Sequence, residues 1–102
     1  PEAVSASGDA DAGNAQAYRL EQNSPNPFNP STRIRYTLQK PVFVKLTVYD
    51  ILGRKVRTLV NGHQQAGSYT VTFDGRDLAS GVYLYKLKIG NVVETRKMML
   101  IR

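Results

Sequence analysis

Residues 42–53, VFVKLTVYDILG, decide the fold class, because apolar and polar side chains alternate along them until the chain reaches a turn. In an extended strand the two alternating sets point to opposite faces. The apolar set is Val42, Val44, Leu46 and Val48, and the set between them is Phe43, Lys45, Thr47 and Tyr49. Asp50 and Gly53 then occupy the first and fourth positions that a type I turn prefers. The stretch predicts a half-buried β-strand followed by a tight turn.

The same period of two recurs on both sides of this strand. In residues 33–38 Ile34, Tyr36 and Leu38 alternate with Arg33, Arg35 and Thr37, and in residues 68–73 Tyr69, Val71 and Phe73 alternate with Ser68, Thr70 and Thr72. Segments rich in β-branched or aromatic residues, which favour strands, are 18–22, 54–60, 82–89 and 92–101. Seven strands are therefore predicted, and no stretch supports a long amphipathic helix.

Turn residues separate these segments. Pro41 marks a boundary, because proline opens a strand but does not sit centrally in one. Asn61-Gly62 and Gly90-Asn91 have the residue types of two-residue turns. Seven strands over residues 18–102 give about 12 residues per strand and turn, a spacing typical of sandwiches. We predict an all-β fold, an immunoglobulin-like antiparallel β-sandwich of about seven strands, although a small barrel would show the same pattern.

Residues 1–17 differ in composition from the rest of the 102-residue chain. They hold one β-branched apolar residue and no aromatic one, too little to offset the entropy of ordering the backbone. They also hold three of the eight acidic residues and no basic residue, which leaves 14 basic against five acidic side chains in residues 18–102. We predict a flexible acidic linker over 1–17, attached to an upstream domain, and one basic folded domain over 18–102.

Residues 23–32, NSPNPFNPST, form the least ordinary stretch of the sequence. Pro25, Pro27 and Pro30 fix φ and push the residues before them toward extended conformations. Phe28 is the one large apolar side chain among them. The stretch therefore predicts a stiff loop at the edge of the sandwich, with Phe28 packed inside.

Together with four later stretches, this loop resembles a known family. The stretches are 48–56 (VYDILGRKV), 67–69 (GSY), 78–85 (LASGVYLY) and 97–102 (KMMLIR). In this order they look like the type A C-terminal sorting domain of the bacterial type IX secretion system, and the related immunoglobulin-like domain of flagellar hook-capping proteins shares several of them. The resemblance covers about residues 18–102.

The resemblance implies a domain without catalytic activity and without a cofactor or metal. Such a domain directs an attached cargo protein of a Gram-negative bacterium from the periplasm across the outer membrane, so that the cargo is secreted or held at the cell surface. The implied partners are the type IX outer-membrane translocon, its shuttle proteins and a sortase-like cysteine protease. Cleavage would fall in the linker, and we expect the domain to be a monomer.

The resemblance also implies roles for individual residues. Recognition of the sorting signal falls on Gly81, Val82, Tyr83, Lys97 and Arg102. Structural motif positions are Pro25, Asn26, Pro27, Phe28, Asn29, Pro30, Asp50, Gly53 and Arg54. The chain departs from the family pattern at Met98 and Met99, where β-branched residues are frequent, and at Lys97, which stands alone where two basic residues are common.

The sequence contains few residues that are suited to catalysis. The chain has no cysteine, and its single histidine, His63, falls in a predicted loop over 61–67. The five acidic residues of 18–102 are scattered, and no glycine-rich phosphate-binding loop occurs. We predict no catalytic site, no metal site and no small-molecule substrate.

The basic excess and the tyrosines raise two further possibilities. A charged face containing Arg33, Arg35 and Lys45 with Tyr36 and Tyr49 could bind nucleic acid, but outward positions of any half-solvated sheet are polar, so no nucleic-acid partner is predicted. The alternative function is a carbohydrate-binding or adhesion module on a secreted enzyme. That hypothesis needs exposed aromatic rings, and the expected ones are Tyr49 and either Tyr83 or Tyr85.

Overall fold

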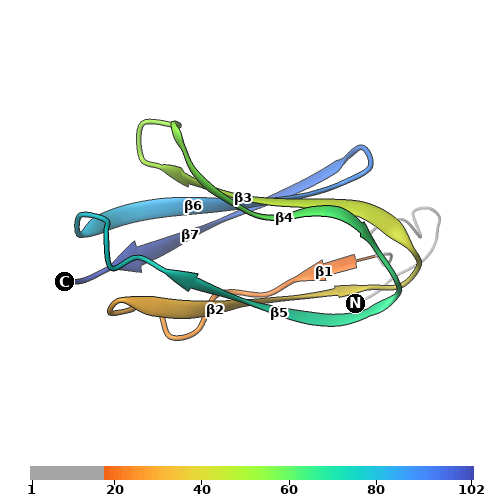
Figure 1. Ribbon diagram of the computed structural model, residues 1–102, viewed down its shortest axis with the longest axis horizontal. Helices are drawn as coiled ribbons and strands as arrows, with labels where there is room; N and C mark the ends of the chain where they lie inside the picture. Colours follow the sequence, from red (N-terminus) through yellow and green to blue (C-terminus); the bar gives the residue numbers. More distant parts are fainter. Residues whose placement is uncertain (1–17) are drawn as a thin grey trace.

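The computed structural model describes residues 18–102, and the predicted linker over 1–17 lies outside the described residues (Figure 1). The described part consists of seven β-strands. They are β1 (Tyr18–Leu20), β2 (Ser31–Leu38), β3 (Val42–Asp50), β4 (Lys55–Gln64), β5 (Gly67–Asp74), β6 (Gly81–Ile89) and β7 (Val92–Leu100). No helix among residues 18–102 is long and apolar enough to cross a membrane.

The strands form two antiparallel sheets that face each other as layers (Figure 1). One sheet has three strands in the order β1-β2-β5, and the other has four in the order β4-β3-β6-β7. The chain changes sheet between β2 and β3, between β4 and β5, and between β5 and β6. The prediction of an immunoglobulin-like sandwich of about seven strands is confirmed, and the two separate sheets exclude the small barrel.

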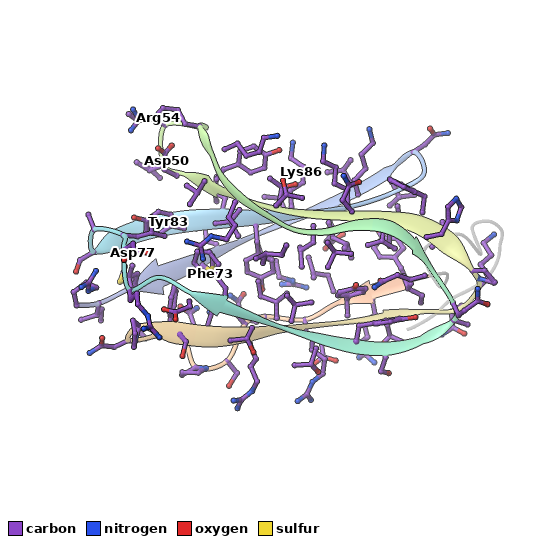
Figure 2. The ribbon with its side chains drawn as sticks, in the orientation of Figure 1. Asp50, Arg54, Phe73, Asp77, Tyr83 and Lys86 are labelled. Atoms are coloured by element: carbon purple, nitrogen blue, oxygen red, sulfur yellow. The ribbon has the colours of Figure 1, made fainter. Side chains whose placement is uncertain are left out.

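The core lies between the sheets, as the alternating pattern predicted. Figure 2 shows the labelled Phe73 and Tyr83 pointing into the space between the two layers. The fully buried side chains include Ile34 and Tyr36 of β2, Leu46 and Val48 of β3, Tyr85 and Leu87 of β6, and Met98 and Leu100 of β7. Burial of each such side chain contributes roughly 1.5–3 kcal/mol, so this interlayer core is the main source of stability.

The turn predicted at Asn61-Gly62 is wrong. Strand β4 runs on to Gln64, and Asn61 pairs there with Lys45 of β3. Continuing the ladder satisfies the backbone groups of these residues, which outweighs their local turn preference. The chain instead turns after Gln64, and the positive φ falls on Gly67. His63 therefore lies in a strand rather than a loop, with its exposed ring edge-on to Phe43 at a centroid distance of 5.4 Å.

The expectation that Tyr83 or Tyr85 is exposed is also wrong. Tyr83 and Tyr85 are both buried, because residues two apart in a strand share a face and this face of β6 meets the other sheet. Tyr36 is likewise in the core, while Arg33 and Arg35 point outward from the three-stranded sheet and Lys45 belongs to the four-stranded one. The residues of the charged face that was considered for nucleic-acid binding are therefore divided between opposite sides of the molecule.

The two ends of the sandwich are built differently (Figure 1). At one end, on the left of the view, lie the proline-rich loop 23–30, the turn 51–54, the connection 75–80 and residues 98–102. We call this the signature end. At the other, the short-turn end, lie the connections 39–41, 65–66 and 90–91. Every motif residue singled out from the sequence except Lys97 lies at the signature end, and Lys97 precedes it on β7.

Candidate functional site

The proline-rich loop lies along the outer edge of β7. The backbone N–H of Phe28 donates to the carbonyl of Met99 at 2.9 Å, and the Phe28 carbonyl accepts from the N–H of Ile101 at 2.9 Å. Asn26 adds its Oδ1, which accepts from the N–H of Met99 at 3.0 Å. The Nε2 of Gln22 donates to the carbonyl of Lys97 at 2.7 Å. An edge that would otherwise be open to other strands is therefore covered over residues 97–101.

A buried network holds the loop in this position. Asn23 is 3% exposed, and its Nδ2 donates to Pro25 O at 3.1 Å and to Thr32 Oγ1 at 3.0 Å. Its backbone N–H donates to the hydroxyl of Tyr85 at 2.8 Å, and that hydroxyl donates to Glu21 O at 2.7 Å. Burial raises the pKa of Tyr85, which keeps the phenol protonated and able to donate. Each of these buried polar groups has a partner, which fixes one conformation of the loop.

The loop is also anchored from inside the sandwich. Phe28 is buried and packs edge-on against Phe73, with ring centroids 6.1 Å apart, so its predicted packing inside is confirmed. Above it, the N–H of Gly75 donates to Pro30 O at 2.8 Å. A Cβ at Gly75 would lie 3.1 Å from Cδ2 of Leu100. This distance is shorter than an ordinary van der Waals contact, so a larger residue at position 75 would require Leu100 or the loop to shift by a few tenths of an ångström.

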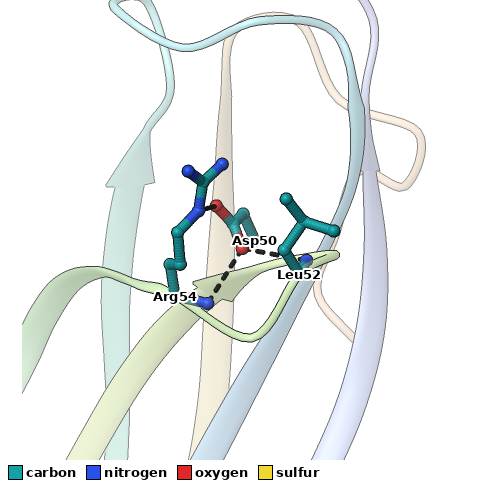
Figure 3. A network of polar contacts seen from close by, with 3 residues as sticks. All are labelled: Asp50, Leu52 and Arg54. Atoms are coloured by element: carbon teal, nitrogen blue, oxygen red, sulfur yellow. Dashed lines mark hydrogen bonds and ion pairs between the residues drawn. The ribbon is translucent and has the colours of Figure 1, made fainter.

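The turn after β3 is organised by one carboxylate (Figure 3). Oδ1 of Asp50 accepts from the N–H groups of Leu52 and Arg54, each at 2.9 Å, and Oδ2 accepts from Nε of Arg54 at 2.8 Å. The N–H of Gly53 donates to Asp50 O at 3.0 Å, which confirms the predicted turn. The backbone N–H of Arg54, followed by its side chain, lowers the pKa of Asp50. Asp50 thus remains an acceptor at neutral pH and rigidifies the turn.

A second aspartate–arginine pair, not predicted from the sequence, organises the connection after β5. Oδ1 of Asp74 accepts from the N–H of Arg76 at 3.0 Å, and Oδ2 accepts from its Nε at 2.9 Å. Hydrogen bonds from the Arg76 side chain and then its backbone lower the pKa of Asp74. Across the sandwich, a guanidinium nitrogen of Arg57 donates to Asp74 O at 2.7 Å, and the guanidinium lies over the Phe73 ring. This contact ties the two sheets together at the signature end.

The Gly81-Val82-Tyr83 motif forms the corner where the chain enters β6. The hydroxyl of Tyr83 donates to Ala79 O at 2.7 Å, and the side chain is 7% exposed. This is the arrangement of a tyrosine corner, which fixes the same corner in many immunoglobulin-like sandwiches. Gly81 has φ +153°, a conformation that other residues rarely adopt. Gly81 and Tyr83 thus shape the corner from within, whereas Val82 faces outward.

The predicted recognition residues are only partly brought together. Asn26, Val82 and Lys97 line a shallow groove of about 190 Å³ with Met98 and Met99. Arg102 lies apart from it: its N–H donates to Ser80 Oγ at 2.9 Å, and its guanidinium donates to Leu78 O at 2.6 Å. Among residues 18–102, no three His, Cys, Asp or Glu side chains gather as a metal site requires. At its surface the signature end presents this groove and the exposed Arg102.

Comparison with known families bears on this surface. The model of the secretion system C-terminal sorting domain matches residues 24–101. The chain belongs to this family. The match extends from the proline-rich loop that covers the edge of β7 to the end of β7 itself. The resemblance drawn from the five sequence stretches is therefore confirmed.

The sorting domain is also similar in fold to part of a solved structure. It superposes on part of a chain from a study of PorZ, described as an essential bacterial surface component of the type IX secretion system of Porphyromonas gingivalis. The TM-score is 0.57 at 20% identity, over 93% of the sorting domain chain and 13% of the other. At this identity the likeness establishes a shared fold. No curated protein matched the sequence.

Sequence reasoning missed several residues that shape the surface of the sorting domain. Asn23, Thr32 and Tyr85 hold the loop, and Gly75 makes room for it. The signal for the first two was present, since they flank the proline-rich stretch at either side. Tyr85 and Gly75 gave no such signal, because Asn23, the partner of Tyr85, and Pro30, the partner of Gly75, are distant from them in sequence and become neighbours only in the fold.

Proposed function

We propose that this sorting domain is a non-catalytic export signal of the type IX secretion system. It directs an attached cargo protein through the periplasm and across the outer membrane, to the cell surface or the medium. The family supports the sorting role, and the fold shared with PorZ, a type IX component, agrees with that system. The partner that reads the signal is the outer-membrane translocon with its shuttle proteins.

The observation that carries the proposal is the convergence of the family motifs at the signature end. Their buried members interlock, and their exposed members line a partly apolar groove that includes Val82, Met99 and Lys97. A cluster of apolar side chains next to a charge is the usual composition of a protein-recognition patch. We assign recognition to Val82 and Lys97 directly, and to Gly81 and Tyr83 through the corner that positions Val82.

Arg102 has a mixed role in this proposal. Its guanidinium holds the connection 75–80 through Leu78 O, and its remaining N–H groups are exposed beside that connection. The proline-rich residues 25–30 and the turn residues Asp50, Gly53 and Arg54 act as structural supports. Their hydrogen bonds fix the elements on which the exposed residues stand.

We further propose that residues 1–17 link the domain to its cargo and contain the site at which a sortase-like cysteine protease removes it. Their small, polar and acidic composition supports an accessible segment. The domain itself, residues 18–102, would act as a monomer. The carbohydrate-binding alternative loses its main support, because Tyr83 and Tyr85 are buried and Lys86 Nζ lies 4.9 Å from the Tyr49 ring centroid.

The test is to fuse residues 18–102 to a neutral periplasmic reporter in a bacterium that has the type IX system. The reporter is expected outside the outer membrane, and it should stay in the periplasm when the translocon is deleted. Retention of an intact, folded fusion in the wild-type strain would overturn the proposal.

The residues are tested in the same fusion. Lys97→Ala and Val82→Ser are expected to lower export with little change in the urea midpoint, because both side chains project from the outer face. Arg35→Ala, on the opposite sheet, is the matched control and should export normally. Combining Lys97→Ala with Arg102→Ala should lower export further. Normal export by this pair would show that the recognition surface lies elsewhere.

A further inference from the structure

The outward strand positions of the four-stranded sheet include several lysines and no carboxylate. We name this outer face of the sheet the lysine face, and its basic members are Lys45, Lys55, Lys86, Lys88 and Lys97. The strand register places each on the side away from the other sheet. In Figure 2 the labelled Lys86 points away from the interior. None of the outward positions of β3, β4, β6 and β7 is Asp or Glu.

The positions of these lysines are unfavourable for the stability of the sheet. Lys45 and Lys88 are directly opposite each other on β3 and β6, and Lys86 is the next outward residue along β6. Like charges in directly opposed positions destabilise a sheet. A soluble surface ordinarily mixes both signs, which would relieve this repulsion. The arrangement is therefore better explained by an external negative charge than by the fold.

The opposite side of the molecule provides a contrast. Arg19, Arg33 and Arg35 lie on the outer face of the three-stranded sheet, where their cross-strand partners are Thr37, Thr72 and Thr70. Glu21 lines the same depression as Arg33 and Arg35, so a carboxylate stands near these two charges. The positive charge is thus partly offset by a carboxylate on this face, whereas no outward strand position of the four-stranded sheet holds one.

The lysine face also exposes apolar side chains between its charges. Phe43 is 45% exposed and Val93 is 50% exposed, each two residues from a lysine or opposite one. Lysine stems cover apolar surface while the ammonium group stays in the polar layer. Positive charges with interspersed apolar side chains on a broad face match the boundary between lipid headgroups and acyl chains.

We propose that the lysine face docks this domain on an anionic phospholipid bilayer. Charge complementarity supports a bilayer as the partner. The lysines are spread over several strands rather than gathered around one point, which suits a surface with many phosphate groups. Each lysine near an anionic membrane contributes about fivefold in affinity. Three lysines together therefore contribute on the order of 100-fold.

The test uses the full 102-residue chain and vesicle co-sedimentation. The vesicles are phosphatidylcholine alone or phosphatidylcholine with an equal amount of phosphatidylglycerol. The wild-type chain is expected to bind only the second kind, and binding should weaken with added salt. Replacing Lys45, Lys86 and Lys88 by Gln should lower the affinity about 100-fold. The control replaces Arg19, Arg33 and Arg35 by Gln, which removes the same charge and should leave most of the binding.

Several results would overturn the proposal. They are absence of wild-type binding, equal loss in the two triple variants, and preference for poly-glutamate over the anionic vesicles, which would indicate an acidic protein partner instead. If the lysine triple variant does not fold, the single variant Lys88→Gln decides, with an expected loss of about fivefold. Binding of that folded variant equal to wild type would also refute the inference.

Discussion

The signature end and the short-turn end close the same two sheets by different means. At the short-turn end the connections 39–41, 65–66 and 90–91 are exposed and only two or three residues long. At the signature end the turn 51–54 is held locally by Asp50, but the other three segments are hydrogen-bonded to partners distant in sequence: Phe28 to Met99, Gly75 to Pro30 and Arg102 to Ser80. One end depends on local turn chemistry, and the other on elements that must fold together.

This difference explains why the sequence stretches of the family occur together. Three segments stabilise one another through hydrogen bonds and packing: the proline-rich loop, the connection 75–80 and the end of β7. The turns at the short-turn end do not depend on distant segments. Residues such as Gly90 and Asn91 need only satisfy the backbone angles of their own turn. The following predictions test this contrast, beginning with the largest effect.

Deleting Met98–Arg102 should unfold the domain or bring it close to unfolding. The deletion removes the buried side chains of Met98 and Leu100, worth roughly 1.5–3 kcal/mol each, and uncovers Phe28. Small domains are stable by only about 5–15 kcal/mol. Urea unfolding followed by circular dichroism measures the loss. Inserting three glycines between Gly90 and Asn91 should cost far less, and an equal loss for the insertion would remove the distinction between the ends.

Gly75→Ala should lower the free energy of unfolding by about 1–3 kcal/mol, as overpacking does in a filled core. The new Cβ would lie 3.1 Å from Leu100 and 3.4 Å from the Pro30 carbonyl. Gly62→Ala, near the short-turn end, is the matched control, because a Cβ there would meet nothing within 4 Å. Its midpoint should be unchanged or slightly raised. Equal midpoints for the two variants would contradict the close packing at the signature end.

Tyr83→Phe should lower the free energy of unfolding by about 1 kcal/mol, since it removes the hydrogen bond to Ala79 O from a buried ring. The short-turn end provides a counterpart, because the hydroxyl of Tyr69 donates to Gln65 O at 2.6 Å over the same separation of four residues. That bond is exposed, so Tyr69→Phe should change stability by less than half as much. Thermal or urea unfolding of both variants measures the difference, and a larger effect at Tyr69 would reverse the contrast.

The smallest effect concerns pH. The pKa of Asp50 and of Asp74 is lowered in the folded domain, so both carboxylates stabilise it above their ordinary pKa of 3.8 and cease to do so as pH falls through the lowered values. The urea midpoint of the wild type should therefore fall in this acidic range. Asp50→Asn and Asp74→Asn should each reduce the decrease of the urea midpoint at acidic pH. A pH profile identical to wild type in the double variant would show that these turns contribute nothing.

The sequence predicted the strands better than the signature end. Alternation at residues 33–38 and 42–49 identified faces that the structure buries, and Gly90-Asn91 identified a true hairpin, because both signals are local. The extension of β4 to Gln64 was missed, since pairing with β3 overrides the preference of Asn61-Gly62 for a turn. Roles that depend on distant partners, such as those of Tyr85 and Gly75, left no mark in the local pattern.

Because the proline-rich loop covers the edge of β7, the groove between them forms late in folding. Asn26 and Met99 are 73 residues apart in sequence, so the groove beside them forms only when the two ends of the folded region have met. Contacts of such long sequence separation close late and slow the folding of a domain. A half-synthesised or clipped chain therefore presents no groove at all. Under the proposed function, a receptor that binds this groove would therefore bind only a sorting domain that is complete and folded.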